Sequence, residues 1–185
     1  MLLARTGRLE QVLQYQFAFA SVSARRRLNG ALAVRVVEQP IAGIAEFSDG
    51  GLLLVSAKGN ILGPVPESLN GAANVMHWRL TRGPMKTGDV FLPPEHVALL
   101  QSLWAVLAQA AGGALQPQFI GQREDSETTF DIHTAQGTVI SVSADDRGSD
   151  QLTKLRSVVR DLYRDSPSRT LRSIDLRYGD RVYVQ

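Results

Sequence analysis

The amino-acid sequence predicts an α+β protein whose strands are mostly antiparallel. Apolar residues recur at helical spacing in three segments, and in several shorter segments they alternate with polar residues as in half-buried strands. Glycine-containing turn signals separate many of the alternating segments. Because short turns join neighbouring antiparallel strands, this pattern favours local hairpins over long parallel crossovers. The sequence contains no internal repeat, heptad array or low-complexity tract.

The helical periodicity predicts three amphipathic helices. Their expected ranges are Gly7–Phe17, Val97–Ala111 and about Gln151–Tyr163. The second helix follows Pro94 and is expected to stop at Gly112-Gly113, since glycine readily ends a helix. The third is expected to begin with Ser149 or Asp150 as its N-cap, because both side chains can accept hydrogen bonds from the first turn.

The alternating segments predict the strands. Their expected ranges are Leu32–Val37, Ile41–Phe47, Leu52–Ser56, Met76–Leu80, Gln116–Gln122, Thr128–Thr134, Thr138–Ser143, Ser173–Arg177 and Arg181–Val184. Ala135-Gln136-Gly137 is expected to be a hairpin loop, and Gly179-Asp180 is a two-residue turn signal between the last two strands. Aromatic residues are sparse, so Trp78, Trp104 and Tyr163 are expected to anchor the core.

Composition narrows the possible functions. The 185 residues are 44% hydrophobic and 21% charged, as in ordinary globular proteins with a packed core. The net charge of +2 is too balanced to indicate binding to nucleic acid. The absence of cysteine excludes disulfides, thiolate nucleophiles and cysteine-based metal sites. No apolar run reaches the roughly 18–20 residues of a membrane-spanning helix, and the first residues do not resemble a signal peptide.

The search for catalytic chemistry finds isolated residues only. His77, His96 and His133 lie far apart in sequence, and none belongs to an HExxH pair or accompanies a GxSxG motif. Asp145-Asp146 lacks the spacing of a calcium loop and is interpreted as a solvated turn. Arg25-Arg26-Arg27 is the one dense basic cluster, and a solvated edge or an acidic partner explains it better than nucleic acid. We therefore predict no catalytic residue, metal or cofactor.

The end of the chain carries a resemblance to a known family. Ser173-Ile174-Asp175-Leu176-Arg177-Tyr178, followed by Val182 and Val184, resembles the terminal hairpin of the FtsQ/DivIB family of bacterial cell-division proteins. Three upstream segments look like strands of that family and occur in its order: Ala20–Arg25, Leu32–Ala42 and Leu54–Ile61. The similarity covers about Leu9–Gln185.

The resemblance implies two extracytoplasmic units. Residues 1–63 would form a truncated POTRA-like αβ module without its first strand, and residues 64–75 a linker. Residues 76–185 would form an FtsQ-type β domain, a mostly antiparallel sheet with two packed helices. The family's cytoplasmic tail and transmembrane helix have no counterpart in the sequence. We therefore expect a fragment, a mis-started gene model or a divergent relative, acting at the periplasmic face of the inner membrane.

The resemblance also implies a function without catalysis. Family members are divisome scaffolds that recruit FtsB and FtsL, and a segment of FtsB adds as a strand to the edge of their last strand. Carried over, the protein-binding residues are Tyr178, Arg181, Val182, Tyr183 and Val184. The family's partner-binding arginine corresponds to Thr128, so that ionic contact is not carried over, and Arg123 is the nearest substitute.

Three alternatives remain open at this point. The last hairpin could simply seal a sheet without binding a partner, because that role also requires alternating apolar residues. The chain could be another envelope assembly or secretion component with a POTRA-like unit. It could also be a hydrolase built around His133 and Asp145-Asp146.

Overall fold

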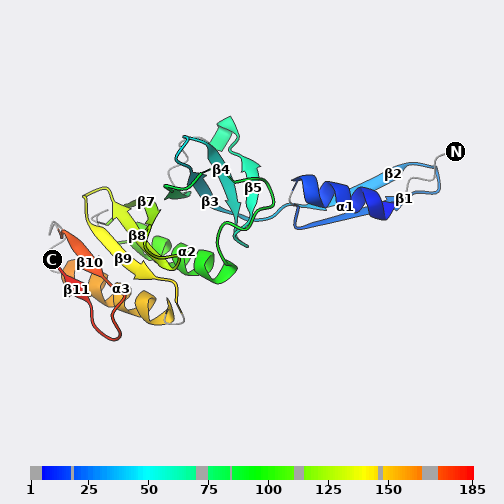
Figure 1. The fold of residues 1–185 in the computed structure, drawn as a ribbon. Helices are drawn as coiled ribbons and strands as arrows, with labels where there is room; N and C mark the ends of the chain where they lie inside the picture. The colour runs from blue at the N-terminus through cyan, green and yellow to red at the C-terminus, as the bar shows by residue number, and fades with distance from the viewer. Residues whose placement is uncertain are drawn as a thin grey trace.

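A computed structural model describes residues 6–17, 19–69, 75–83, 85–110, 115–145, 148–163 and 171–185. Within these residues the chain is α+β, as predicted (Figure 1). Its helices are α1 (Thr6–Phe17), α2 (Pro94–Ala108) and α3 (Gly148–Tyr163), with a 3₁₀ turn, η1, at Glu67–Leu69. Its strands are β1 (Ser21–Arg26), β2 (Leu32–Val37), β3 (Ile41–Glu46), β4 (Leu52–Ser56), β5 (Ile61–Pro64), β6 (Met76–Arg79), β7 (Pro117–Gln122), β8 (Thr129–Thr134), β9 (Val139–Ser143), β10 (Ser173–Asp175) and β11 (Tyr183–Val184).

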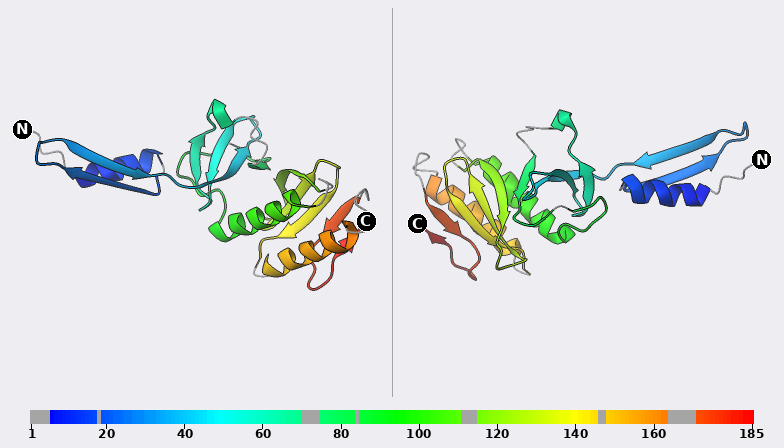
Figure 2. Two further views of the ribbon diagram at one scale, coloured as in Figure 1. Left: turned by 180° about the vertical axis from the view of Figure 1, so that it is seen from behind. Right: turned by 45° about the horizontal axis from the view of Figure 1, so that its top comes forward.

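The strands form two sheets. Strands β1 and β2 pair with each other as a separate antiparallel hairpin, which Figures 1 and 2 show beside α1. The other strands form one mixed sheet in the order β11-β10-β9-β8-β7-β6-β3-β4-β5. Most of its neighbours are antiparallel, but β10 with β9, β3 with β6, and β6 with β7 are parallel. The sequence predicted the antiparallel majority and did not predict the parallel pairs.

Two of the three parallel pairs arise because a helix separates their strands along the chain, whereas β3 and β6 are separated by β4 and β5. α2 lies between β6 and β7, and α3 lies between β9 and β10, so each helix provides the crossover that two parallel neighbours require. The two helices are in contact with each other. Among the described residues, no helix is long and apolar enough to cross a membrane.

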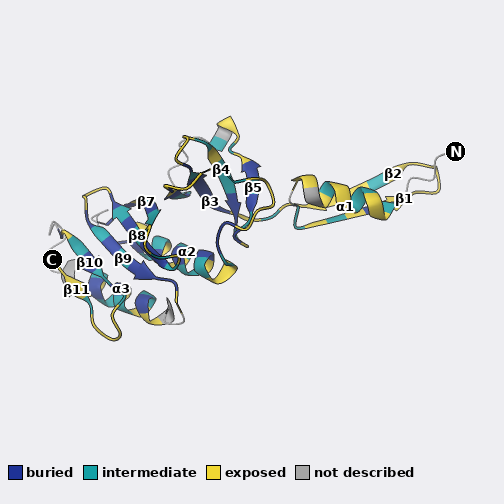
Figure 3. Cartoon of the chain, viewed as in Figure 1, coloured by how far each residue is buried: buried dark blue, intermediate teal, exposed yellow. Residues whose placement is uncertain are grey.

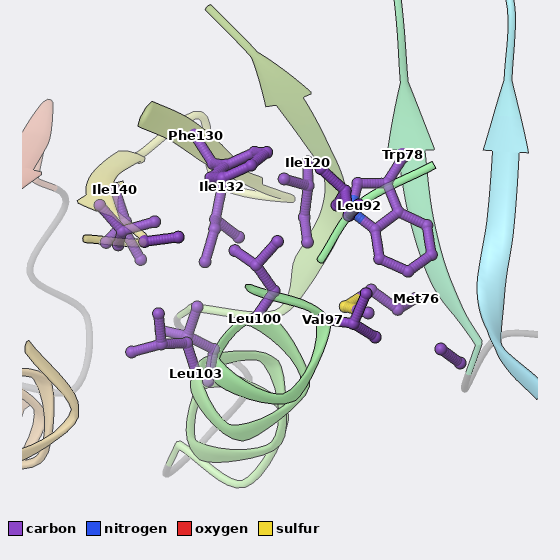
Figure 4. Packing of buried hydrophobic residues seen from close by; sticks show 14 of the residues in the cluster. Met76, Trp78, Leu92, Val97, Leu100, Leu103, Ile120, Phe130, Ile132 and Ile140 are labelled. Carbon is purple, nitrogen blue, oxygen red and sulfur yellow. The ribbon is translucent and has the colours of Figure 1, made fainter. Parts of the chain in front are cut away.

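The core lies between the large sheet and its helices. Figure 4 shows Leu100 and Leu103 of α2 directed toward Ile120 and Ile132 on the central strands. Each of these side chains is fully buried. Trp78 is also buried in this cluster, as predicted, and Trp104 packs partly against it, whereas the Tyr163 side chain lies outside the described residues. Apolar burial of this extent is the main stabilising contribution to the fold.

The helix starts differ from the predicted ones. α2 begins at Pro94. Proline is favoured in the first turn of a helix, because the N–H that it lacks would have no hydrogen-bond partner there. α2 ends at Ala108, and the predicted stop at Gly112-Gly113 lies outside the described residues. α3 begins at Gly148, so Ser149 and Asp150 lie in its first turn and are not its N-cap. A carboxylate such as Asp150 is favourable there because it faces the positive end of the helix dipole.

The terminal hairpin is shorter than predicted. Gly179-Asp180 does form a turn, in which the Arg181 N–H donates to the Tyr178 carbonyl at 2.9 Å. This turn lies within a loop, because β10 already ends at Asp175 and β11 begins only at Tyr183. The Asp175 carboxylate accepts a hydrogen bond from the Arg177 N–H at 3.1 Å, and such local bonds compete with strand pairing.

The large sheet extends across the predicted domain boundary. Strands β3 to β5 were expected in the first unit, yet β3 pairs directly with β6 and contributes to the same buried cluster. The predicted linker at 64–75 therefore connects two strands of one sheet. The break in sheet pairing lies between Val37 and Ile41, where the chain leaves the β1–β2 hairpin. The proline and glycine content of 64–75 suggested a boundary. Local composition carries no information on the pairing of β3 with β6, which are distant in sequence.

Candidate protein-binding edge

One edge of the large sheet, strand β5, is covered by the chain itself. The Ile61 N–H donates to the Asp89 carbonyl at 2.9 Å, and the Gly88 N–H donates to the Ile61 carbonyl at 2.8 Å. Pro64, at the end of β5, has no N–H to offer. The loop that contains Asp89 therefore occupies the positions at which another strand would pair. Covering an edge in this way prevents unwanted strand addition.

The opposite edge, strand β11, is open within the described part of the chain. Gln185 and Ser173 exchange hydrogen bonds at 3.1 and 3.3 Å, so these two residues form a hydrogen-bonded antiparallel pair. Because such pairs alternate along antiparallel strands, the N–H and C=O of Val184 point away from β10. No other described strand lies beyond β11 in the sheet order. Val184 thus presents a donor and an acceptor to a further strand.

The predicted binding residues surround this open edge. Tyr178 and Tyr183 are 54% and 51% exposed, and their rings meet edge to face with centroids 5.5 Å apart. Val184 is 38% exposed, and Arg181 is exposed as well. Val182 differs from expectation, because its side chain packs partly against the core. The exposed part of the predicted set is therefore an aromatic pair beside a short strand edge.

Two buried side chains hold the hairpin in place. Ile174 and Leu176 are both fully buried, as the alternation predicted. The Leu176 N–H donates to the Ser141 carbonyl at 3.0 Å, and the Lys154 ammonium of α3 donates to the Leu176 carbonyl at 3.1 Å. The chain after β10 is thus fixed to both β9 and α3 before it enters the loop that carries Tyr178.

An ion pair missed in the sequence analysis orders the same loop. The Arg177 guanidinium donates to both carboxylate oxygens of Asp175, at 2.9 and 2.6 Å. Burial alone would raise the pKa of Asp175, but the hydrogen bonds and charge of Arg177, aided by Arg123, lower it below its ordinary value. The guanidinium also lies 5.4 Å from the centre of the Tyr178 ring. The i, i+2 spacing of an acid and an arginine on one strand face was the available signal.

The face that carries Tyr183 is polar across several strands. Tyr183 pairs with Asp175, Asp175 with Ser141, and Ser141 with Asp131, so these side chains lie in one row on one face of the sheet. The Ser141 hydroxyl donates to the Asp131 carboxylate at 2.6 Å. Arg123, the nearest substitute for the family's arginine, forms an ion pair with Asp125 at 3.4 Å. It also lies close enough to lower the pKa of Asp175.

A surface groove adjoins the edge on the helical side. It has a volume of about 580 Å³ and lies between the start of α3 and the terminal loop. Its lining residues are Asp150, Thr153, Lys154, Gly179 and Asp180.

Of the candidate catalytic residues that the structure describes, His133 and Asp145 lie toward opposite ends of the β8–β9 hairpin. His133 stacks on Phe119 with ring centroids 4.3 Å apart. The Arg79 guanidinium lies over the Phe119 ring, 4.2 Å from its centroid. Burial and the charge of Arg79 lower the pKa of His133, while Asp131 opposes that shift. Asp146 lies outside the described residues. In the part of the chain that is described, no three histidine or acidic side chains are placed to hold a metal ion.

Comparisons with known proteins do not identify this chain: no protein-family model matches it, and no curated protein matches it.

Proposed function

We propose that this protein is a non-enzymatic scaffold that binds a partner segment by strand addition at β11. The observation that carries the proposal is the Val184 N–H and C=O directed away from β10 at an open edge. Main-chain hydrogen bonds of this kind give affinity, and neighbouring side chains give specificity. Tyr178 and Tyr183 would supply the aromatic contacts beside the added strand.

The contrast between the two edges supports this choice. The chain covers β5 with a loop and a proline, but within the described residues it leaves β11 uncovered and flanked by exposed tyrosines. Exposed aromatic side chains are enriched where proteins bind each other, because they bury large area at low entropic cost. Two half-exposed tyrosines beside an open edge therefore support partner binding over a purely sealing role.

The resemblance to the FtsQ/DivIB family supplies the biological part of the proposal. It assigns the scaffold to the bacterial divisome at the periplasmic face of the inner membrane, with partners of the FtsB and FtsL type. It also implies a POTRA-like module with a role in partner binding at residues 1–63. Neither assignment requires a cofactor, and neither involves nucleic acid.

The test is co-purification of edge variants with an FtsB/FtsL-type complex. Val184→Pro removes the outward N–H but no bond to β10, so the fold is retained and binding falls by about tenfold or more. Tyr178→Ala combined with Tyr183→Ala is expected to weaken binding similarly. Val90→Ala is the matched control, since Val90 is 67% exposed but lies beside the covered edge. Unchanged binding by folded edge variants, checked by circular dichroism, would overturn the proposal.

A further inference from the structure

The β1–β2 hairpin contains a second open strand edge, remote in sequence from β11. β2 pairs with β1 alone among the described strands. The Arg27 N–H donates to the Ala31 carbonyl at 2.8 Å, which fixes the alternation of hydrogen bonds along the hairpin. Residues 33, 35 and 37 therefore bond to β1, whereas the main-chain groups of Leu32, Val34 and Val36 point to the free side of β2.

On β1, in contrast, an outward-pointing main-chain group is already hydrogen-bonded to α1. Ala24 lies opposite Val34, and its outward N–H donates to the Glu10 carboxylate of α1 at 2.5 Å. Ala24 is the one residue of α1, β1 and β2 that is buried among those described, so α1 lies over the β1 half of the hairpin. Figure 3 shows the remainder of this unit as exposed or half-exposed. α1 thus blocks one edge of the hairpin and leaves the β2 edge accessible.

The accessible edge is lined by apolar side chains. Leu32 is 42% exposed, and Val34 and Val36 are each 43% exposed. Because each is paired with a residue on the face that α1 covers, all three side chains lie on that face. The three residues that offer main-chain hydrogen bonds are therefore also the ones with uncovered apolar area. A strand added to β2 would pair with these main-chain groups, and its own apolar side chains would cover the exposed apolar area next to α1.

The other face of the hairpin is basic. Arg25 and Arg35 lie on it, two paired positions apart along the hairpin, and both are exposed. Residues 6–38 contain five arginines and two glutamates, which gives this segment a formal charge of +3. Among the described residues, no ion pair engages Arg25 or Arg35. Opposite charges across neighbouring strands stabilise pairing and like charges oppose it, so a second copy of β2 is a poor occupant.

We propose that β2 accepts an extended segment of a partner protein in which apolar residues alternate with aspartate or glutamate. The apolar residues pair with Leu32, Val34 and Val36 and extend the face under α1, while the acidic residues lie beside Arg25 and Arg35. This inference deepens the partner-binding role proposed for the N-terminal module, but it uses no residue of the β11 edge, so its failure is distinguishable from a failure of strand addition at β11.

The test measures binding of fluorescent peptides to the full chain by anisotropy. A short peptide in which valine alternates with glutamate is expected to bind about tenfold or more tightly than one in which valine alternates with lysine. Val34→Pro removes the outward N–H of β2 without removing a bond to β1, and it is expected to abolish binding. Arg35→Glu is expected to reverse the preference between the two peptides. Val90→Ala, at the covered edge of the large sheet, is the control and is expected to bind both peptides as the unchanged protein does.

Several outcomes would overturn the proposal. Undiminished binding of the acidic peptide by folded Val34→Pro would show that strand addition at β2 is not responsible. Dimers of the free chain that Val34→Pro dissociates would assign the edge to a second copy. Binding to vesicles rich in phosphatidylglycerol that requires Arg25 and Arg35, with no peptide binding, would assign the basic face to a membrane surface.

Discussion

At the scale of single residues, the ion pair of Asp175 and Arg177 connects the fold to the candidate binding edge. Its partners are two positions apart, and each is about one-fifth exposed. The pair terminates β10, holds the loop that carries Tyr178, and places a cation beside that ring. Charge-assisted bonds with two parallel contacts are among the stronger hydrogen bonds in proteins. The pair therefore orders the loop before any partner binds, which lowers the entropic cost of binding.

The lowered pKa of Asp175 predicts an acid-sensitive contribution to stability. Because the folded-state pKa lies below the unfolded value of about 3.9, the contribution is present above that pH and is lost as the pH falls through the folded pKa. Asp175→Asn is expected to cost about 1–2 kcal/mol at pH 7, and the difference from the unchanged protein is expected to shrink below about pH 4. Urea unfolding at several pH values measures both effects. A difference that stayed constant down to pH 2 would contradict the assignment.

At the scale of elements, sequence periodicity located the helices and strands but could not predict the order of the strands in the sheet. Every predicted helix and strand range overlaps a described element, because periods of 3.6 and 2 report which side of an element is buried. Strand β1 was identified through the family resemblance alone. Strand order was not predictable in the same way, since β3 beside β6 depends on packing between segments distant in sequence. The loop that covers β5 was missed for this reason, and with it the contrast between the two edges.

A substitution in the turn between β4 and β5 tests how the loop that covers β5 packs on this turn. Gly59 has a φ of +79°, and a Cβ there would lie 1.8 Å from the Leu92 carbonyl oxygen. The Phe91 N–H donates to the Gly59 carbonyl at 2.7 Å, so the turn and the loop are packed together. Gly59→Ala is therefore expected to cost about 3 kcal/mol or more by thermal or urea unfolding.

Gly50 provides the matched control, because its φ of +81° is similar but a Cβ would meet no atom within 4 Å. Gly50→Ala is expected to cost only about 1–2 kcal/mol, which is the price of the left-handed backbone alone. Equal costs for the two variants would show that the loop does not pack on the turn as described.

At the scale of the whole molecule, the buried core and the N-terminal unit are largely independent. The buried cluster begins at Ala42 and includes no residue of α1, β1 or β2. Figures 1 and 2 show that unit at the end of the molecule opposite β10 and β11. Composition indicated one globular chain with a packed core, and local patterns could not show that the core excludes the first elements. The two proposed binding edges thus lie on parts of the chain that do not share a hydrophobic core.

This separation predicts the effect of removing residues 1–37. Because unfolding slopes scale with the area that is buried on folding, the shortened chain is expected to retain cooperative urea unfolding with a slope lowered by no more than about 10–15%. Its melting temperature is expected to change by less than about 5 °C. Binding at the β11 edge is expected to persist, whereas binding of the acidic peptide is expected to disappear with β2. Loss of cooperative unfolding would contradict the independence of the core, because it would mean that α1, β1 and β2 contribute stabilising contacts to the large sheet.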